Sequence, residues 1–258
     1  GGPRHSIIVG ESGTGKTMLS RAMYHFAKKI KVISEDSPFI EVNCAQFTNP
    51  DIAAIEIFGS EKGAFTGAIE KKGLFELANG GIIFLDEAHA LEKYQTMLLK
   101  AIETGKIRRI GGTRDIEVRV IIIAASTKNL KRVFLPELYQ RLAQYEIKVP
   151  PLRKRPFCEK EQILEHFKNN YEKAALDRYG IKLNVEFTNA ARGLLLNGYY
   201  PRNVRQFRDV IYSSIDAATP LINNINQEKE VVSVVDLEHI PLDMIDDYEQ
   251  AWDKDENN

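Results

Sequence analysis

Two motifs in this chain combine the residue types and the spacing that phosphate chemistry requires. The first is an eight-residue run that fits the pattern G-x-x-x-x-G-K-[S/T] in full. Its glycines let backbone N–H groups face phosphate oxygens, its lysine can reach the β- and γ-phosphates, and its threonine hydroxyl can ligate Mg²⁺. We therefore expect the run to bind ATP. Its residues are Gly10, Glu11, Ser12, Gly13, Thr14, Gly15, Lys16 and Thr17.

The second motif is the acidic pair Asp86-Glu87, which ends the apolar run from Ile82 to Leu85. A carboxylate at the end of a buried strand can hold Mg²⁺, directly or through water, and its neighbour can polarise the attacking water. We expect Asp86 to bind the metal and Glu87 to activate the water that hydrolyses ATP. The plain structural alternative is that Asp86 caps the following helix.

The same pair begins the letters Asp86-Glu87-Ala88-His89, which spell DEAH, a helicase box. A helicase of this kind would need a second large domain and a basic channel for nucleic acid, and the sequence shows neither. We therefore expect His89 to be a polar residue of the helix that follows the strand.

Short apolar runs alternate with helical patterns around both motifs, in the order that a P-loop requires. Apolar runs bounded by glycine or acidic residues predict buried parallel strands. The pattern predicts an α/β fold of the P-loop type, with a mostly parallel sheet flanked by helices. The predicted strands are Ser6–Val9, Phe39–Asn43, Ile82–Leu85, Val118–Ala125 and Tyr145–Val149, and the predicted helices are Lys16–Lys31, Ile52–Phe58 and Tyr94–Glu103.

Pro150-Pro151 ends this alternation, and helical periodicity replaces the β-branched runs beyond Arg155. We predict an α/β P-loop ATPase domain at residues 1–155, a small all-helical lid domain at 156–242 and an acidic, disordered tail at 243–258. The helices predicted for the lid are Glu161–Tyr179, Asn189–Leu196 and Val204–Ala218, with a further short element from Ser233 to Asp236.

The composition of the 258 residues is that of a globular protein, with 43% hydrophobic and 28% charged residues. No apolar stretch approaches the roughly 20 residues of a membrane-spanning helix, and no signal peptide opens the chain, so we expect a cytoplasmic protein without membrane contact. The two cysteines lie outside any metal-binding pattern and are expected to be reduced. A net charge of −1 argues against DNA binding by this segment alone. Because the chain starts without methionine, we expect a fragment of a longer protein.

Between the two motifs lies the run Gly63-Ala64-Phe65-Thr66-Gly67-Ala68. Glycine lets a backbone turn sharply, and an exposed aromatic side chain at a loop tip usually contacts a partner. The plain alternative is a glycine-rich turn without a special role. In this position the run resembles the GAFTGA signature of bacterial sigma-54 activators, which are AAA+ ATPases that remodel RNA polymerase carrying that sigma factor. The resemblance implies that Phe65 and Thr66 contact sigma-54.

The resemblance extends over roughly residues 1–215 and implies roles for further residues. Asn43 matches the polar residue that communicates with the catalytic glutamate and senses the γ-phosphate, and Thr127 stands where the family has its polar sensor. Arg141 matches an arginine finger presented to the ATP of a neighbouring subunit, a role that suits a permanently charged, planar group. Arg205 matches the arginine of the helical domain that senses nucleotide in cis. From chemistry alone, Asn43 could satisfy backbone groups and both arginines could be surface charges.

The sequence departs from the family pattern at three places. Leu135 stands where a second arginine finger is usual. The sensor strand ends in Ser126-Thr127 where the family has Thr-Asn, and Arg202 replaces a glycine. These departures leave the expected ATP pocket unchanged and concern the coupling of hydrolysis between subunits.

The resemblance implies a Mg²⁺-dependent ATPase that self-associates into a ring, a hexamer in this family, and drives its loop against sigma-54 RNA polymerase. DNA binding would belong to a domain absent from this fragment. Two alternatives stay open. One is a related AAA+ ATPase that acts on another protein partner, and the other is a nucleotide-dependent binding module with weak turnover, which Leu135 favours.

Overall fold

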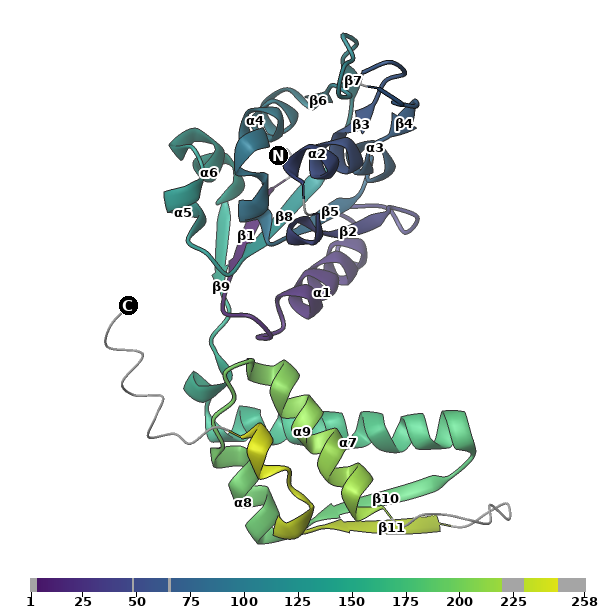
Figure 1. Ribbon diagram of the computed structural model, residues 1–258, viewed down its shortest axis with the longest axis vertical. Coiled ribbons are helices and arrows are strands. Elements are labelled where there is room, and N and C mark those ends of the chain that lie inside the picture. Colours follow the sequence, from purple (N-terminus) through teal and green to yellow (C-terminus); the bar gives the residue numbers. More distant parts are fainter. Residues whose placement is uncertain (1–3, 48, 65, 220–229, 246–258) are drawn as a thin grey trace. The chain divides into compact units, whose positions relative to one another are not determined.

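We describe the protein from a computed structural model, over residues 4–47, 49–64, 66–219 and 230–245 (Figure 1). Most of the predicted acidic tail lies outside these described residues. Within the described part of the chain, no helix is long and apolar enough to cross a membrane.

The chain forms two compact units, and the glycine-rich run is divided between them. The N-terminal unit consists of Gly1–Gly10 and Gly15–Val149, and the C-terminal unit consists of Glu11–Thr14 and Pro150–Asn258. Four residues of this run are therefore grouped with the C-terminal unit.

A five-stranded sheet forms the centre of the N-terminal unit, in the order β2-β5-β8-β1-β9. All neighbouring strands in it run parallel, which confirms the expected α/β fold class. Because parallel strands end at a common edge, β2 and β5 finish side by side, with Asn43 opposite Asp86. The strands are β1 (Ser6–Val9), β2 (Phe39–Asn43), β5 (Ile82–Asp86), β8 (Ile121–Ser126) and β9 (Tyr145–Lys148).

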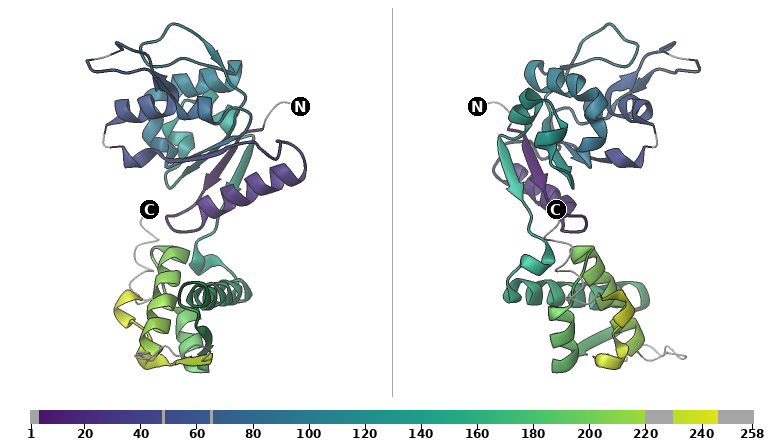
Figure 2. Two further views of the ribbon diagram at one scale, coloured as in Figure 1. Left: turned by 90° about the vertical axis from the view of Figure 1, so that its right-hand side faces the viewer. Right: turned by 60° about the vertical axis from the view of Figure 1, so that its left-hand side comes forward.

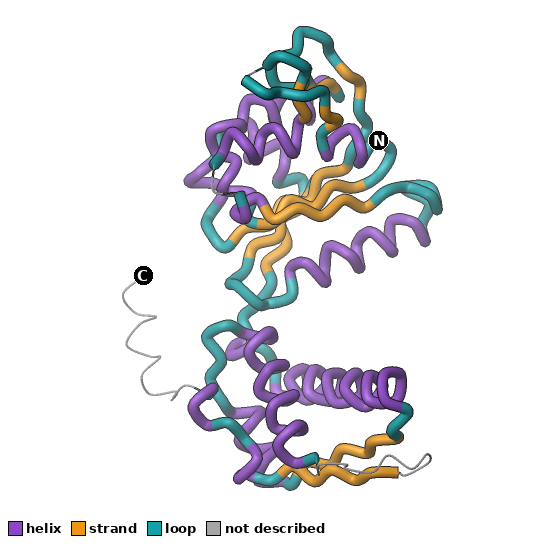
Figure 3. Tube along the Cα trace, turned by 45° about the vertical axis from the view of Figure 1, so that its right-hand side comes forward, coloured by secondary structure: helices purple, strands orange, loops and turns teal. Residues whose placement is uncertain are grey.

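Helices cover both faces of this sheet, which explains why β5 and β8 are apolar up to their polar last residues, Asp86 and Ser126 (Figure 3). On one face, Leu19 and Met23 of α1 (Lys16–Lys29) pack on a cluster that contains Phe84. The next residue, Leu85, belongs to the larger core on the other face, together with Phe58. The helices that contribute to this larger core are α2 (Pro50–Phe58), α3 (Leu74–Leu77), α4 (Gln95–Thr104), α5 (Leu130–Val133) and α6 (Pro136–Leu142).

Two small hairpins lie side by side at one end of the N-terminal unit (Figure 2). The first pairs β3 (Gly59–Ser60) with β4 (Lys71–Lys72), so the GAFTGA run lies in the loop between them. The second pairs β6 (Lys106–Ile107) with β7 (Ile116–Glu117). A parallel bridge between Ser60 and Ile110 joins the two hairpins. None of these two-residue strands was predicted.

The C-terminal unit is mainly helical, with α7 (Phe157–Tyr179), α8 (Asn189–Asn197) and α9 (Asn203–Ala218). The expectation of helices alone is corrected by a two-stranded parallel sheet of β10 (Lys182–Phe187) and β11 (Glu230–Val235). The physical reason is alternation: Leu183 and Val185 of β10 are buried in the core, while their immediate neighbours in the strand are more exposed. This core packs β10 against α7 and β11 against α9.

Candidate active site

The first motif connects β1 to α1 and directs a buried lysine back over the loop. Lys16 is 6% exposed, and its Nζ donates a hydrogen bond of 2.9 Å to the carbonyl of Gly10. Gly15 precedes the helix with a φ of 101°, a left-handed value that glycine adopts without strain. The first turn of α1 contains no acidic residue, so its N-terminal dipole is available to an anion. This geometry suits a phosphate group.

Residues of the C-terminal unit hold the tip of the same loop. Arg153 donates two hydrogen bonds of 2.8 Å to the carboxylate of Glu11, and the amide of Asn203 donates a third of 3.2 Å. These donors lower the pKa of Glu11, with the Arg153 hydrogen bond as the largest cause. The Asn203 amide also donates to the Ser12 carbonyl over 2.9 Å, and Arg155 donates to the Thr14 carbonyl over 2.8 Å. Sequence reasoning assigned no role to Arg153 or Asn203; no local pattern marks Arg153, whereas Asn203 directly follows Arg202 in the family motif of the helical domain.

Arg205, the expected nucleotide sensor, begins near this tip in α9. Its backbone N–H donates to the Gly13 carbonyl over 3.2 Å. Gly13 has a φ of 74°, and a Cβ added to it would lie 2.0 Å from the carbonyl oxygen of Arg202. The close approach of the loop to the start of α9 thus requires glycine at position 13.

The acidic motif lies at the carboxyl edge of the sheet. Burial raises the pKa of Asp86, while the positive charge of Lys16 opposes that rise. The described residues contain no group of three or more His, Cys, Asp or Glu side chains able to hold a metal. Mg²⁺ does not need one, because it commonly binds one or two carboxylates and completes its shell with phosphate oxygens and water. Asp86 and the Thr17 hydroxyl are donors of the type that this ion prefers.

Glu87 is held by the end of β8. Its Oε2 accepts hydrogen bonds from the N–H of Thr127 over 3.2 Å and from the Thr127 hydroxyl over 2.9 Å. His89 Nδ1 lies 3.3 Å from the same oxygen. The backbone of Glu87 is left-handed, with a φ of 51°, which is uncommon for a residue other than glycine and typical of functional sites. The structure therefore brings Thr127 and Glu87 together.

Asn43 has a different partner from the one that the family resemblance implies. Its Oδ1 accepts a hydrogen bond of 3.0 Å from the N–H of Ala45 and caps a short helical turn. Within the described residues, no hydrogen bond joins Asn43 to Glu87. Asn43 still ends β2 beside Asp86, so it lies at the same edge of the sheet.

The expected arginine finger lies on the surface of the N-terminal unit. Arg141 is in α6, its side chain is 56% exposed, and its guanidinium lies 3.3 Å from Glu103. Leu135, where a second arginine is usual, is 44% exposed. Both side chains are accessible to another molecule.

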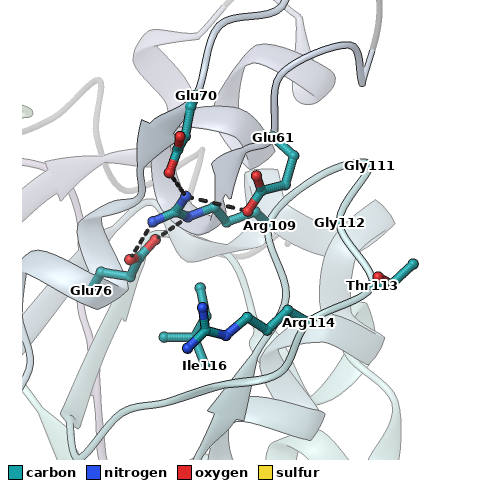
Figure 4. A pocket seen from close by; sticks show the side chains of 9 residues that line it. All are labelled: Glu61, Glu70, Glu76, Arg109, Gly111, Gly112, Thr113, Arg114 and Ile116. Carbon is teal, nitrogen blue, oxygen red and sulfur yellow. Dashed lines mark hydrogen bonds and ion pairs between the residues drawn. The ribbon is translucent and has the colours of Figure 1, made fainter.

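One arginine contacts residues on both sides of the GAFTGA run (Figure 4). Phe65 lies outside the described residues, and Thr66 is exposed. Arg109, from the second hairpin, donates bonds of 2.8 and 2.9 Å to Glu76 of α3. The same guanidinium contacts Glu61 and Glu70, which flank the GAFTGA run, at 3.3 and 2.8 Å.

A second contact between the hairpins is steric. A Cβ added to Gly111 would lie 2.4 Å from the Cβ of Ala64, within the GAFTGA run. The loop of the second hairpin therefore supports the first at close range. Sequence reasoning did not find Arg109 or Gly111, because their partners are distant in the sequence.

Comparison with known proteins identifies the class to which this fold and site belong. A family model described as Sigma-54 interaction domain matches residues 3–148. The chain is 36% identical over 216 residues to the Nif-specific regulatory protein of Herbaspirillum seropedicae, covering 80% of this chain and 37% of that protein. It is 35% identical over 216 residues to the sigma-54-dependent transcriptional activator SfnR of Pseudomonas putida, covering 81% and 56%.

Solved structures show the same architecture. The crystal structure of NtrX from Brucella abortus in complex with ADP aligns with a TM-score of 0.74 and 26% identity, covering 93% of this chain and 50% of that one. The NtrX complex with ATP aligns with a TM-score of 0.70 and 26% identity, covering 98% and 55%. The chain spans less than two thirds of the length of each of these relatives.

The chain therefore belongs to the sigma-54 interaction domain family, the AAA+ ATPase domains of sigma-54-dependent transcriptional activators. This membership confirms the family resemblance, the fold class and the ATPase function expected from the sequence.

Proposed function

We propose that this domain binds ATP at the Gly10–Thr17 run and hydrolyses it at the carboxyl edge of the sheet, within a cytoplasmic activator. The observation that carries the proposal is the buried Lys16, which lies close enough to Asp86 for its positive charge to lower the pKa of that carboxyl group. Glu87 is the next residue in the chain. This combination can neutralise phosphate charge and present a base to water. The related NtrX structures with ADP and ATP support a nucleotide as the ligand.

Mg²⁺, when bound, would neutralise charge on the phosphate oxygens, and Thr17 and Asp86 would hold it. Glu87 would orient and deprotonate the attacking water. Thr127 already occupies Oε2 of that carboxylate, which leaves Oε1 to receive the proton. Asn43, at the adjacent strand end, would report the state of the γ-phosphate, and Arg205 would sense the nucleotide, as the family resemblance implies.

Arg141 supports assembly into a ring. An exposed arginine whose partner Glu103 is 32% exposed can exchange that surface pair for a phosphate at little cost. If Arg141 acts on the ATP of a neighbour, each site is complete only in an oligomer, and the family implies a hexamer. Hydrolysis should then rise steeply with protein concentration.

The GAFTGA loop would be the part of the domain that acts on sigma-54 RNA polymerase, through Phe65 and Thr66. The exposure of Thr66 supports this role. DNA binding, where the full protein has it, would lie in segments beyond this chain.

The variant Glu87→Gln tests the catalytic assignment. An amide cannot accept the proton from water, so we expect ATP binding to persist and steady-state phosphate release to fall at least about 100-fold. Lys16→Ala is the contrasting variant, and it should lose ATP binding itself. Phosphate release by Glu87→Gln at the unmodified rate would contradict the assignment.

The variant Thr66→Ala tests the partner. We expect unchanged ATP hydrolysis and loss of sigma-54 capture in the presence of a transition-state analogue of ATP. Normal capture would refute the role of the loop and would favour an ATPase that acts on another protein.

A second candidate is a nucleotide-dependent binding module with weak turnover. It is favoured by Leu135, an exposed apolar residue where the family usually has a second arginine finger. Phosphate release that stays slow and proportional to protein concentration, despite tight ATP binding, would support this candidate over the ring-dependent ATPase.

A further inference from the structure

We infer that His89 is a positioning residue for Glu87, acting with Ser126 to hold one carboxylate oxygen and leave the other to water. The inference rests on the proposed hydrolysis of ATP. His89 Nδ1 lies 3.3 Å from Glu87 Oε2 and 3.1 Å from the hydroxyl oxygen of Ser126. In this chain, the histidine of the DEAH sequence therefore contacts the glutamate of the same sequence, an arrangement that does not require helicase function.

The surroundings of His89 keep its ring in place. Ser126 ends β8, is fully buried, and its hydroxyl oxygen accepts a hydrogen bond of 2.9 Å from the N–H of Lys128. The His89 and Glu87 side chains are only 16% and 20% exposed. A ring anchored on a buried strand end is a rigid support for the neighbouring carboxylate.

The charge of Glu87 decides which ring nitrogen carries the proton. Burial lowers the pKa of His89, so the ring is neutral at neutral pH and exists as one of two tautomers. With its proton on Nε2, the ring would direct the Nδ1 lone pair at a carboxylate oxygen 3.3 Å away. With its proton on Nδ1, it directs positive charge between that oxygen and the Ser126 hydroxyl. The second arrangement is favoured electrostatically.

This arrangement has a consequence for catalysis. Thr127 donates two hydrogen bonds to Oε2, and the Nδ1–H of His89 adds a positive charge density beside the same oxygen. Oε2 is therefore a poor proton acceptor. Oε1 becomes the base, and the carboxylate is held in one orientation before water attacks.

A purely structural histidine is the alternative, and kinetics separate the two. In His89→Leu, a side chain of similar bulk without a donor, we expect kcat for ATP to fall about five-fold or more with KM unchanged, as the loss of about 1 kcal/mol in orientation requires. His89→Asn can place an amide N–H near the former Nδ1 and should regain most of that loss. His25→Asn, on the exposed face of α1, is the control for histidine replacement.

The tautomer is tested without reference to activity. Long-range ¹H–¹⁵N spectra of the nucleotide-free chain, assigned with His89→Asn, should show a proton on Nδ1 of His89. In Glu87→Gln, where the negative charge is gone, the population should shift toward Nε2–H. A wild-type ring protonated on Nε2 would overturn the inference.

The two experiments distinguish two kinds of failure. If the wild-type chain releases no phosphate under any assembly condition, the proposed function is refuted. The ¹H–¹⁵N measurement of the tautomer still tests whether His89 donates toward Glu87. If the wild-type chain hydrolyses ATP and Glu87→Gln does not, but His89→Leu keeps the wild-type kcat, only the inference about His89 is refuted.

Discussion

Replacing Arg109 by alanine should destabilise the hairpin around the GAFTGA run far more than the same change at Arg108, its neighbour in sequence. The Arg109 side chain is 9% exposed and forms a two-pronged ion pair with Glu76, which is 10% exposed. The Arg108 side chain is 50% exposed and pairs with Asp115, which is 35% exposed. The two variants therefore remove the same side chain from a buried and from an exposed pair.

The burial of each partner sets the expected magnitude. Removing Arg109 leaves the mostly buried Glu76 without this partner, and the loss of one partner from a buried pair costs about 3–5 kcal/mol. Glu61 and Glu70 are 38% and 68% exposed, so their pairs with Arg109 add at most about 1 kcal/mol. We expect about 3 kcal/mol or more for Arg109→Ala and less than about 1 kcal/mol for Arg108→Ala.

Urea unfolding followed by circular dichroism measures both losses, and hydrogen exchange over residues 59–72 locates them. Arg109→Ala should speed exchange in that segment, and Arg108→Ala should not. The double variant Arg109→Met with Glu76→Met replaces the pair by apolar side chains and should recover at least half of the lost stability. Equal costs for the two single variants, or a double variant no better than Arg109→Ala, would refute the reasoning.

Two further predictions concern buried groups of the N-terminal unit. Burial lowers the pKa of His5 from 6.5 to about 4, while its Nδ1 accepts a hydrogen bond from the N–H of Ile122. Between pH 6.5 and 4, His5 is therefore protonated in the unfolded chain but neutral in the folded chain. The free energy of unfolding should fall by up to about 3 kcal/mol over this range. The variant His5→Asn keeps a hydrogen-bond acceptor, and its free energy of unfolding should not show this loss at low pH. A pH dependence equal to that of the wild-type chain would contradict the assignment to His5. Burial also raises the pKa of Cys44 to about 12, whereas Cys158 is exposed, so a thiol reagent should modify one cysteine quickly in the native chain and none in Cys158→Ser. Rapid modification of both would show that Cys44 is accessible.

Elements that depend on local pattern were predictable from the sequence. β5 is a continuous apolar run up to Asp86 because α1 and the helices of the larger core cover its two faces, and such a run is recognisable in the sequence. Helix α9 was predicted almost to the residue, because its buried positions recur with helical spacing. The positions of the glycine-rich run and the acidic pair in the fold followed from the predicted strands that precede them.

Elements that depend on distant partners were not predictable. The two-residue strands of the hairpins are too short to show any periodicity, and pairing across their loops creates them. Arg109 is one of many charged residues until the fold brings Glu76, 33 positions earlier, to its guanidinium. The alternation in β10 was visible in the sequence, but its partner β11 begins only at Glu230, so the segment gave no local sign of pairing.

The eight residues of the glycine-rich run include both features that local pattern predicts and features that depend on distant partners. The positions that its pattern specifies are those that we propose to contact phosphate, and their proposed roles follow from the pattern alone. The unspecified positions belong to the C-terminal unit, where Arg153 holds the carboxylate of Glu11 at 2.8 Å through two bonds. Gly13 shows why this tip cannot vary freely, since any Cβ there would collide with the Arg202 carbonyl. The tip of the run, Glu11–Thr14, therefore depends for its shape on residues that lie beyond Pro150, and we expect Arg153→Ala to weaken ATP binding as a mutation of the run itself would.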